Sequence, residues 1–230
     1  MNREIVRTRT FAKDATNFIV EKTAVALAER DEFRIALSGG NTPRAVYHEL
    51  AKRKLPWAKA LISFGDERCV PPQAAESNFK MANETLLKPA GVPASSVLRM
   101  RGEIVPAVAA SEYEGQLDTL ATKAGESIYQ HDLILLGLGD DGHTASLFPG
   151  TIALQETSRR IVANYIPKLE SWRLTFTFPL IFAARAVCFL VGANKDAKLI
   201  ERIFFGDEDL PAGRVDKNAR EVTWILAEST

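Results

Sequence analysis

The sequence predicts an α/β fold with a mostly parallel central sheet. Short apolar runs alternate along the chain with segments whose apolar residues recur at helical spacing, and this alternation is typical of parallel sheets. The run at residues 133–138 is almost wholly apolar, which favours a central strand covered on both faces. Glycine-rich turns follow two of the apolar runs, and ligands of open α/β sheets bind beyond such strand ends.

The first half of the chain contributes helices and strands in alternation. Residues 15–27 carry apolar and small side chains on one helical face, ahead of a strand at 33–37. A helix follows the next loop, with Thr42 as a suitable N-cap and Pro43 at the first helical position. A further strand is expected to begin near Leu61.

The second half of the chain continues this alternation. A helix is expected at about 106–122, before the strand at 133–138, and a later helix near Asp196. The remaining strands are expected at 160–164, 173–178, 186–192 and 222–226. Because residues 173–178 alternate polar and apolar side chains, this strand is expected to expose one face and to lie near an edge.

The segment 132–149 carries the strongest functional signal. Its apolar strand runs into Gly-Leu-Gly-Asp-Asp-Gly-His, so a glycine-rich turn presents His143 beside Asp140 and Asp141. Gly142 and the neighbouring glycines permit positive φ and close backbone approach, and a histidine side chain titrates near neutral pH. The hypothesis is that His143 is the chemical centre of a site. The alternative is that it only caps the element after an ordinary glycine turn.

A second glycine segment follows the strand at 33–37. It reads Ser38-Gly39-Gly40-Asn41-Thr42 and leads into an amphipathic helix, so strand, loop and helix N-terminus form an anion cradle. The P-loop and the dinucleotide fingerprint do not fit, because no lysine follows the glycines and the third glycine is absent. The pattern favours a phosphorylated small molecule over a nucleotide.

Two basic residues are expected at the same edge of the sheet. Arg68 follows Asp66 and Glu67 at a strand end and is able to hold phosphate through two hydrogen bonds. Lys195 follows the apolar run 186–191 and would add a second phosphate contact. Taken alone, the charged triplet is more typical of a solvated turn and Lys195 of a surface lysine, so both assignments depend on the neighbouring motifs.

Together these motifs resemble the 6-phosphogluconolactonase family, which is related to sugar-phosphate isomerases and deaminases. The resemblance rests on Ser38-Gly39-Gly40-Asn41-Thr42-Pro43, Gly65-Asp66-Glu67-Arg68 and residues 137–149, and extends to Arg173-Leu174-Thr175-Phe176-Thr177 and Gly192-Ala193-Asn194-Lys195. It implies a three-layer α/β/α sandwich with a mostly parallel, Rossmann-like central sheet. It also implies hydrolysis of 6-phospho-D-glucono-1,5-lactone to 6-phospho-D-gluconate in the oxidative pentose phosphate pathway.

Under this hypothesis His143 is the general base that takes a proton from water as the water attacks the lactone carbonyl, without a covalent nucleophile, metal or other cofactor. The residues expected to bind the substrate and its phosphate are Ser38, Gly39, Gly40, Asn41, Thr42, Arg68 and Lys195. The residues expected to support the site are Asp66, Asp140, Asp141, Gly142 and Arg173, of which Arg173 rests on the resemblance alone. The sequence does not choose between Asp140 and Asp141 as the partner of His143.

Two other functions stay open. An amino-sugar phosphate deaminase or a ring-opening isomerase of related fold also uses a glycine loop and an Asp-Gly-His turn, although the continuation Thr144-Ala145-Ser146-Leu147-Phe148-Pro149 favours the lactonase. A sugar-phosphate sensor would keep the phosphate loop without catalysis. Against a sensor, no helix-turn-helix or basic recognition element is evident and His143 is present.

Composition restricts the classes of partner and the cellular locations that the sequence allows. The chain has 230 residues with 29 basic and 29 acidic side chains, so its zero formal charge indicates no nucleic-acid partner and no membrane-attracting surface. No apolar run approaches the ~20 residues of a membrane span and no secretory signal is evident, so a cytoplasmic location is expected. We expect a single domain over residues 1–230 that acts on a small sugar phosphate as a monomer or small homo-oligomer.

Overall fold

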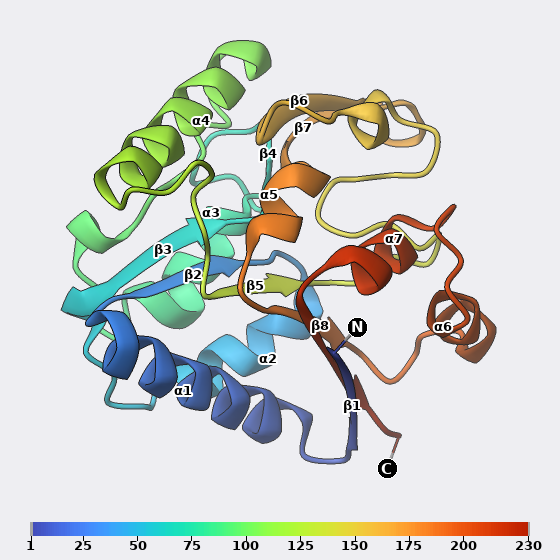
Figure 1. Ribbon diagram of the computed structural model, residues 1–230, viewed down its shortest axis with the longest axis horizontal. Helices are drawn as coiled ribbons and strands as arrows, with labels where there is room; N and C mark the ends of the chain where they lie inside the picture. Colours follow the sequence, from blue (N-terminus) through green and yellow to red (C-terminus); the bar gives the residue numbers. More distant parts are fainter. Residues whose placement is uncertain (1, 230) are drawn as a thin grey trace.

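The computed structural model describes residues 2–229 and places a six-stranded sheet between two layers of helices (Figure 1). All neighbouring strands of this sheet pair in parallel. In spatial order the strands are β1 (Asn2–Thr8), β9 (Glu221–Ala227), β8 (Val187–Val191), β5 (Leu133–Leu136), β2 (Phe33–Leu37) and β3 (Ala60–Phe64). The predicted α/β class with a mostly parallel sheet is confirmed.

Helices cover both faces of this sheet. One face packs against α1 (Phe11–Arg30), α2 (Asn41–Leu50), α3 (Asn78–Ala82) and the π-helical turn η2 (Asn83–Leu87), and the other against α4 (Pro106–Lys123), α5 (Phe178–Ala183), α6 (Ala197–Phe204) and α7 (Pro211–Asn218). Short 3-10 helices are η1 (Trp57–Lys59), η3 (Ala94–Ser96), η4 (Ile152–Gln155) and η5 (Pro167–Leu169). No helix within residues 2–229 is long and apolar enough to cross a membrane.

The side chains of β5 are apolar on both faces of the sheet. Leu133 and Leu135 join the core beside α1 and α2, whereas Ile134 and Leu136 join the core beside α4, because side chains alternate between the two faces of a strand. All four side chains are buried. The strand is therefore apolar throughout, and the three-layer α/β/α arrangement is confirmed.

A second, antiparallel sheet lies above the main one and corrects one expectation. Its strands are β4 (Asp66–Arg68), β7 (Ser171–Phe176) and β6 (Ile161–Ile166), with β7 in the middle. The edge position expected for residues 173–178 is wrong, because β7 pairs on both sides. Its polar Thr175 is buried and accepts a hydrogen bond from the backbone N–H of Ser146 at 3.1 Å, so this polar side chain does not mark a solvent face.

Two element boundaries and one unexpected strand also differ from expectation. Helix α2 begins at Asn41 with Gly40 at the capping position, where φ is 99°, so the prediction that Thr42 is the N-cap is wrong. Strand β5 ends at Leu136 because the glycine turn starts directly after it. Strand β1, whose mixed polar and apolar sequence predicted no element, pairs with β9.

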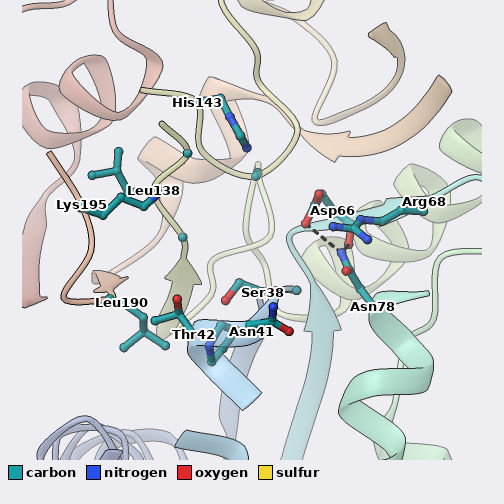
Figure 2. A pocket seen from close by; sticks show the side chains of 17 residues that line it. Ser38, Asn41, Thr42, Asp66, Arg68, Asn78, Leu138, His143, Leu190 and Lys195 are labelled. Carbon is teal, nitrogen blue, oxygen red and sulfur yellow. Dashed lines mark hydrogen bonds between the residues drawn. The ribbon is translucent and has the colours of Figure 1, made fainter. Parts of the chain in front are cut away.

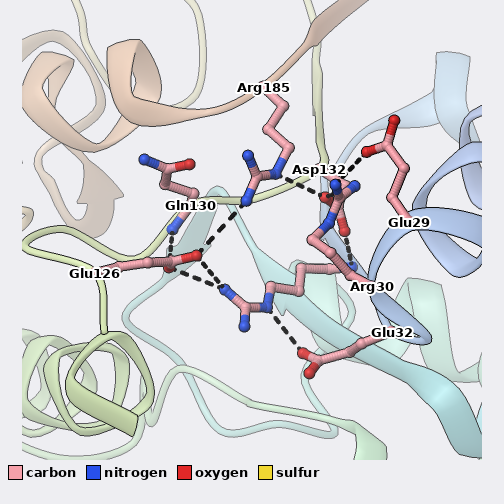
Figure 3. A network of polar contacts seen from close by, with 8 residues as sticks. Glu29, Arg30, Glu32, Glu126, Gln130, Asp132 and Arg185 are labelled. Atoms are coloured by element: carbon pink, nitrogen blue, oxygen red, sulfur yellow. Dashed lines mark hydrogen bonds and ion pairs between the residues drawn. The ribbon is translucent and has the colours of Figure 1, made fainter. Parts of the chain in front are cut away.

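A network of ion pairs joins residues near the amino-terminal ends of β2, β5 and β8 (Figure 3). Arg34 donates to Glu126 at 2.9 Å, while Arg30 and Arg185 donate to Asp132 at 2.7 and 3.1 Å. These charges neutralise one another at the amino-terminal edge of the sheet. The opposite, carboxyl edge is where the glycine turns lie.

Candidate active site

The carboxyl ends of β2, β5 and β8 open onto a cavity of about 210 Å³. In Figure 2, His143 enters this cavity from the side opposite Ser38 and Thr42, with Lys195 on one flank and Arg68 on the other. The cavity brings together many of the residues expected from the sequence, namely Ser38, Gly39, Gly40, Asn41, Thr42, Asp66, Arg68, His143 and Lys195.

A second cavity of about 510 Å³ adjoins the first. The two share Asp66, Arg68, His143 and Ala145 as lining residues, and the second adds Asp140, Asp141, Lys168 and Arg173, among others. Gly142 lines neither cavity. It has a φ of 79°, and a Cβ there would lie 2.7 Å from Leu210, so Gly142 shapes the turn.

The loop from Ser38 to Thr42 has the properties of an anion cradle. A Cβ on Gly39 would lie 1.8 Å from the Asn78 amide oxygen, and Gly40 has a positive φ, so both positions require glycine. The first N–H groups of α2 have no partner within the helix and face an incoming anion. The Oγ of Ser38 is buried and has no hydrogen-bond partner within residues 2–229, so a donor is available beside these amides.

Tyr47 fixes the position of this loop. Its hydroxyl accepts a hydrogen bond from the Ser38 N–H at 2.9 Å and donates one to the Ser38 carbonyl at 2.8 Å. Tyr47 is itself fully buried on α2. The helix that supplies the free amides therefore also anchors the residue that begins the loop.

His143 is oriented by Asp141. The Nδ1 of His143 lies 2.5 Å from Asp141 Oδ1, and the imidazole stacks on Phe148 with ring centroids 3.8 Å apart. Burial raises the pKa of Asp141, but hydrogen bonds from Lys168 and His143 outweigh this effect and lower the pKa to about 2. The ionised carboxylate is a hydrogen-bond acceptor for the N–H at Nδ1. In the neutral tautomer that makes this hydrogen bond, Nε2 carries no proton.

Asp140 has a different partner. Its carboxylate is exposed and pairs with the ammonium of Lys195. The hydrogen bond and the positive charge of Lys195 lower the pKa of Asp140. The two adjacent aspartates therefore have different partners: Asp141 contacts His143, and Asp140 pairs with Lys195.

Arg68 and Arg173 lie opposite each other on the paired strands β4 and β7. Arg68 donates to the Glu76 carbonyl at 2.7 Å, and Arg173 donates to the Trp172 carbonyl at 3.1 Å. Neither guanidinium forms an ion pair with a carboxylate in the described part of the chain. Burial and the positive charge of Arg68 lower the pKa of Arg173. The charges of Asp66 and Glu67 act in the opposite direction on this pKa. Two adjacent guanidinium groups that form no carboxylate ion pair favour an anionic ligand.

Asp66 connects the second sheet to the His143 loop. Its Oδ2 accepts a hydrogen bond from the Ser146 hydroxyl at 2.6 Å, and its Oδ1 accepts one from the Asn78 amide at 3.1 Å. All three side chains are buried. Asp66 therefore holds two loops of the site together.

Several residues of the site were missed by the sequence analysis. Glu67, next to Arg68, accepts hydrogen bonds from the backbone N–H groups of Arg68, Asn78 and Phe79 at 2.7, 2.7 and 2.8 Å and so anchors the loop after β4. In the sequence, only its position next to Arg68 pointed to a place in the site. Phe148 belongs to the continuation after His143 but was not expected to stack on the imidazole, and Lys168, which contacts Asp141, carries no local pattern that marks it.

Comparison with known proteins identifies the family. A sequence model described as glucosamine-6-phosphate isomerases/6-phosphogluconolactonase matches residues 7–224. The chain belongs to this family. The family membership expected from the motifs is therefore confirmed.

Relatives within the family span nearly the whole chain. A protein of Nostoc sp. named 6-phosphogluconolactonase is 39% identical over 213 residues, covering 91% of this chain and 88% of the relative. One of the same name from Synechocystis sp. is 42% identical over 213 residues and covers 90% of this chain and 87% of the relative. The crystal structure of 6-phosphogluconolactonase from Thermotoga maritima matches with a TM-score of 0.87 and 26% identity, covering 99% of this chain and 100% of that chain.

Proposed function

We propose that this chain hydrolyses 6-phospho-D-glucono-1,5-lactone to 6-phospho-D-gluconate in the oxidative pentose phosphate pathway. The observation that carries the proposal is the orientation of His143, whose Nδ1 is bound by Asp141 while its ring faces a cavity lined by the Ser38–Thr42 loop. Relatives named 6-phosphogluconolactonase, at 39% and 42% identity, support the same substrate.

His143 acts as the general base in this proposal. Its Nε2 takes a proton from a water molecule, and the water oxygen forms a bond to the lactone carbonyl carbon. The resulting tetrahedral intermediate breaks the bond between this carbon and the ring oxygen, which receives the proton back from Nε2. Asp141 stabilises the transient imidazolium and holds its tautomer, and one such base contributes about 100- to 10,000-fold in rate.

The phosphate contacts come from three parts of the site. The backbone N–H groups at the start of α2, together with Ser38 and Thr42, supply neutral donors. Lys195 supplies a positive charge at the same cavity, and Arg68 supplies a second one from β4. Asp66 and Arg173 support this arrangement from the second sheet.

The test is the hydrolysis of freshly generated lactone near neutral pH, measured against the spontaneous rate. Wild type, His143→Ala and Arg68→Ala are compared side by side. We expect a lower kcat in the histidine variant. In the arginine variant we expect mainly a higher KM. A wild-type protein that does not accelerate hydrolysis, but converts glucosamine 6-phosphate, would reverse the proposal in favour of an isomerase or deaminase.

Two further features remain predictions. We infer a cytoplasmic location, which cell fractionation tests. We also infer a monomer or small homo-oligomer, which light scattering on the purified chain tests.

A further inference from the structure

Lys168 is the one charged group of the His143 cluster that no sequence motif marks. It lies on η5, in the connection between β6 and β7. Its ammonium contacts Asp141 Oδ2, while His143 Nδ1 contacts Asp141 Oδ1. The same ammonium lies 4.7 Å from the centre of the Phe148 ring, on which His143 stacks.

These contacts tie Lys168 to His143 in two independent ways. Both side chains share the carboxylate of Asp141, and both contact the ring of Phe148. The Lys168 side chain is 53% exposed, so it could extend into solvent instead. An exposed ion pair contributes little to stability. The two contacts instead hold the ammonium beside the groups that touch the imidazole.

We propose that Lys168 is a positioning residue for His143, which holds the far oxygen of Asp141 and limits how strongly that carboxylate stabilises the imidazolium. The kinetic part of this inference rests on the proposed lactonase function, whereas the coupling between Lys168 and His143 does not.

The physical reason lies in what a general base requires. A carboxylate bound to imidazole alone favours the protonated ring, which cannot accept a proton from water. A cation on the other carboxylate oxygen offsets this effect and fixes the carboxylate plane. Lys168 thus constrains Asp141 from the far oxygen while preserving the hydrogen bond that orients His143.

Other charges also face His143, and the test must hold them constant. The titratable groups on the elements around the imidazole are Asp140 and Asp141 on its own loop, Asp66 and Arg68 on β4, Arg173 on β7, Lys168 on η5 and Lys195 after β8. Substituting Lys168 alone leaves the remaining groups in place.

The direct test is an NMR titration of the histidine rings. The chain has 3 histidines, so His143 is assigned by comparison with His143→Ala. In Lys168→Met we expect the His143 midpoint to rise by about 0.5–1 pH unit, because one neighbouring positive charge is removed. Lys168→Arg, which keeps the charge, should restore most of the wild-type value.

Lys217→Met is the matched control. Lys217, on α7, is 50% exposed and pairs with Glu208, so this variant removes an equivalent surface ion pair outside the cavities. It should leave the His143 midpoint unchanged. A His143 midpoint that is the same in Lys168→Met as in wild type would overturn the proposal.

Kinetics distinguish positioning from substrate binding. We expect Lys168→Met to lower kcat/KM at pH 6 more than at pH 8, with KM within about 3-fold of wild type. The reason is that the fall of kcat/KM at acid pH, the acid limb of the profile, follows the titration of His143. In an Asp141→Asn background the same substitution should have no further effect on this limb. A rise in KM with an unmoved limb would assign Lys168 to substrate binding and refute the positioning role.

The two proposals fail separately. If wild type does not accelerate lactone hydrolysis, the proposed function is wrong, and the NMR titration still tests Lys168. If wild type is active but the histidine titration does not respond to Lys168→Met, only the positioning role is wrong.

Discussion

Replacing Gly139 with alanine should displace His143 without altering any group that takes part in the reaction. A Cβ at Gly139 would lie 2.0 Å from His143 Nδ1 and 2.1 Å from Cε1. Gly139 does not have a positive φ, so alanine is acceptable to the backbone itself. The conflict is between the new methyl group and the imidazole.

The size of the displacement follows from these distances. Ordinary contact begins at 3.4 Å, so the ring must move by about 1.4 Å, the difference between that value and 2.0 Å. Such a movement cannot preserve the 2.5 Å contact between His143 Nδ1 and Asp141. A misplacement of about 1 Å costs roughly 100-fold in rate, so we expect kcat to fall by about that factor.

The assay is lactone hydrolysis corrected for the spontaneous reaction, with thermal unfolding measured in parallel. Gly137→Ala is the comparison, because its Cβ would meet nothing within 4 Å and the residue belongs to the same turn. It should lose less than about 10-fold in kcat. A folded Gly139→Ala protein that keeps kcat within about 3-fold of wild type would refute the placement of His143.

Three further predictions concern stability and the loop that carries Arg68. Burial and, to a smaller extent, the charge of Arg34 lower the pKa of His131 to about 3, so the stability from its neutral ring is complete above about pH 6.5 and is lost toward pH 3, by up to ~1.4 kcal/mol per pH unit. Urea unfolding at pH 7 and pH 5 measures this slope, and an equal slope in His131→Asn would contradict it. Gly115→Ala, at an exposed position of α4, should raise the free energy of unfolding by about 0.5–1 kcal/mol, since a Cβ there meets nothing within 4 Å, and an unchanged urea midpoint would contradict this. Glu67→Gln removes one of the two acceptor oxygens that hold the loop after Arg68, so the free energy of unfolding in urea should fall by about 1–3 kcal/mol. In the lactone assay this variant should have a raised KM, and a wild-type KM would argue against this anchor.

The glycine turns were predictable because their signals are local. A buried strand, a glycine run and a helix start lie next to one another in residues 33–50, and the periodicity of each is readable without tertiary information. The same holds for residues 132–149 and His143. The exact helix start was not predictable, because the positive φ of Gly40 moved the cap ahead of Thr42.

The charged partners were not predictable because they are chosen by tertiary contacts. Asp140 and Asp141 are adjacent and chemically identical, and only the positions of Lys195 and Lys168 separate their roles. Lys168 lies 27 residues from Asp141 along the chain, within a segment that has no motif. Alternation in β7 predicted an exposed face, but a buried hydrogen-bond partner for Thr175 made that inference wrong.

The position of the second sheet explains why these distant contacts matter. His143 belongs to a turn of the main sheet, whereas Arg68, Arg173 and Lys168 belong to β4, β7 and their connections. Ser146 joins the two parts, because its hydroxyl donates to Asp66, its N–H to Thr175, and its carbonyl accepts from Asn164. Ser146 therefore helps to fix the His143 loop relative to the strands that carry the guanidinium groups. A change at Ser146 should weaken catalysis and substrate binding together, whereas a change at His143 should affect catalysis alone.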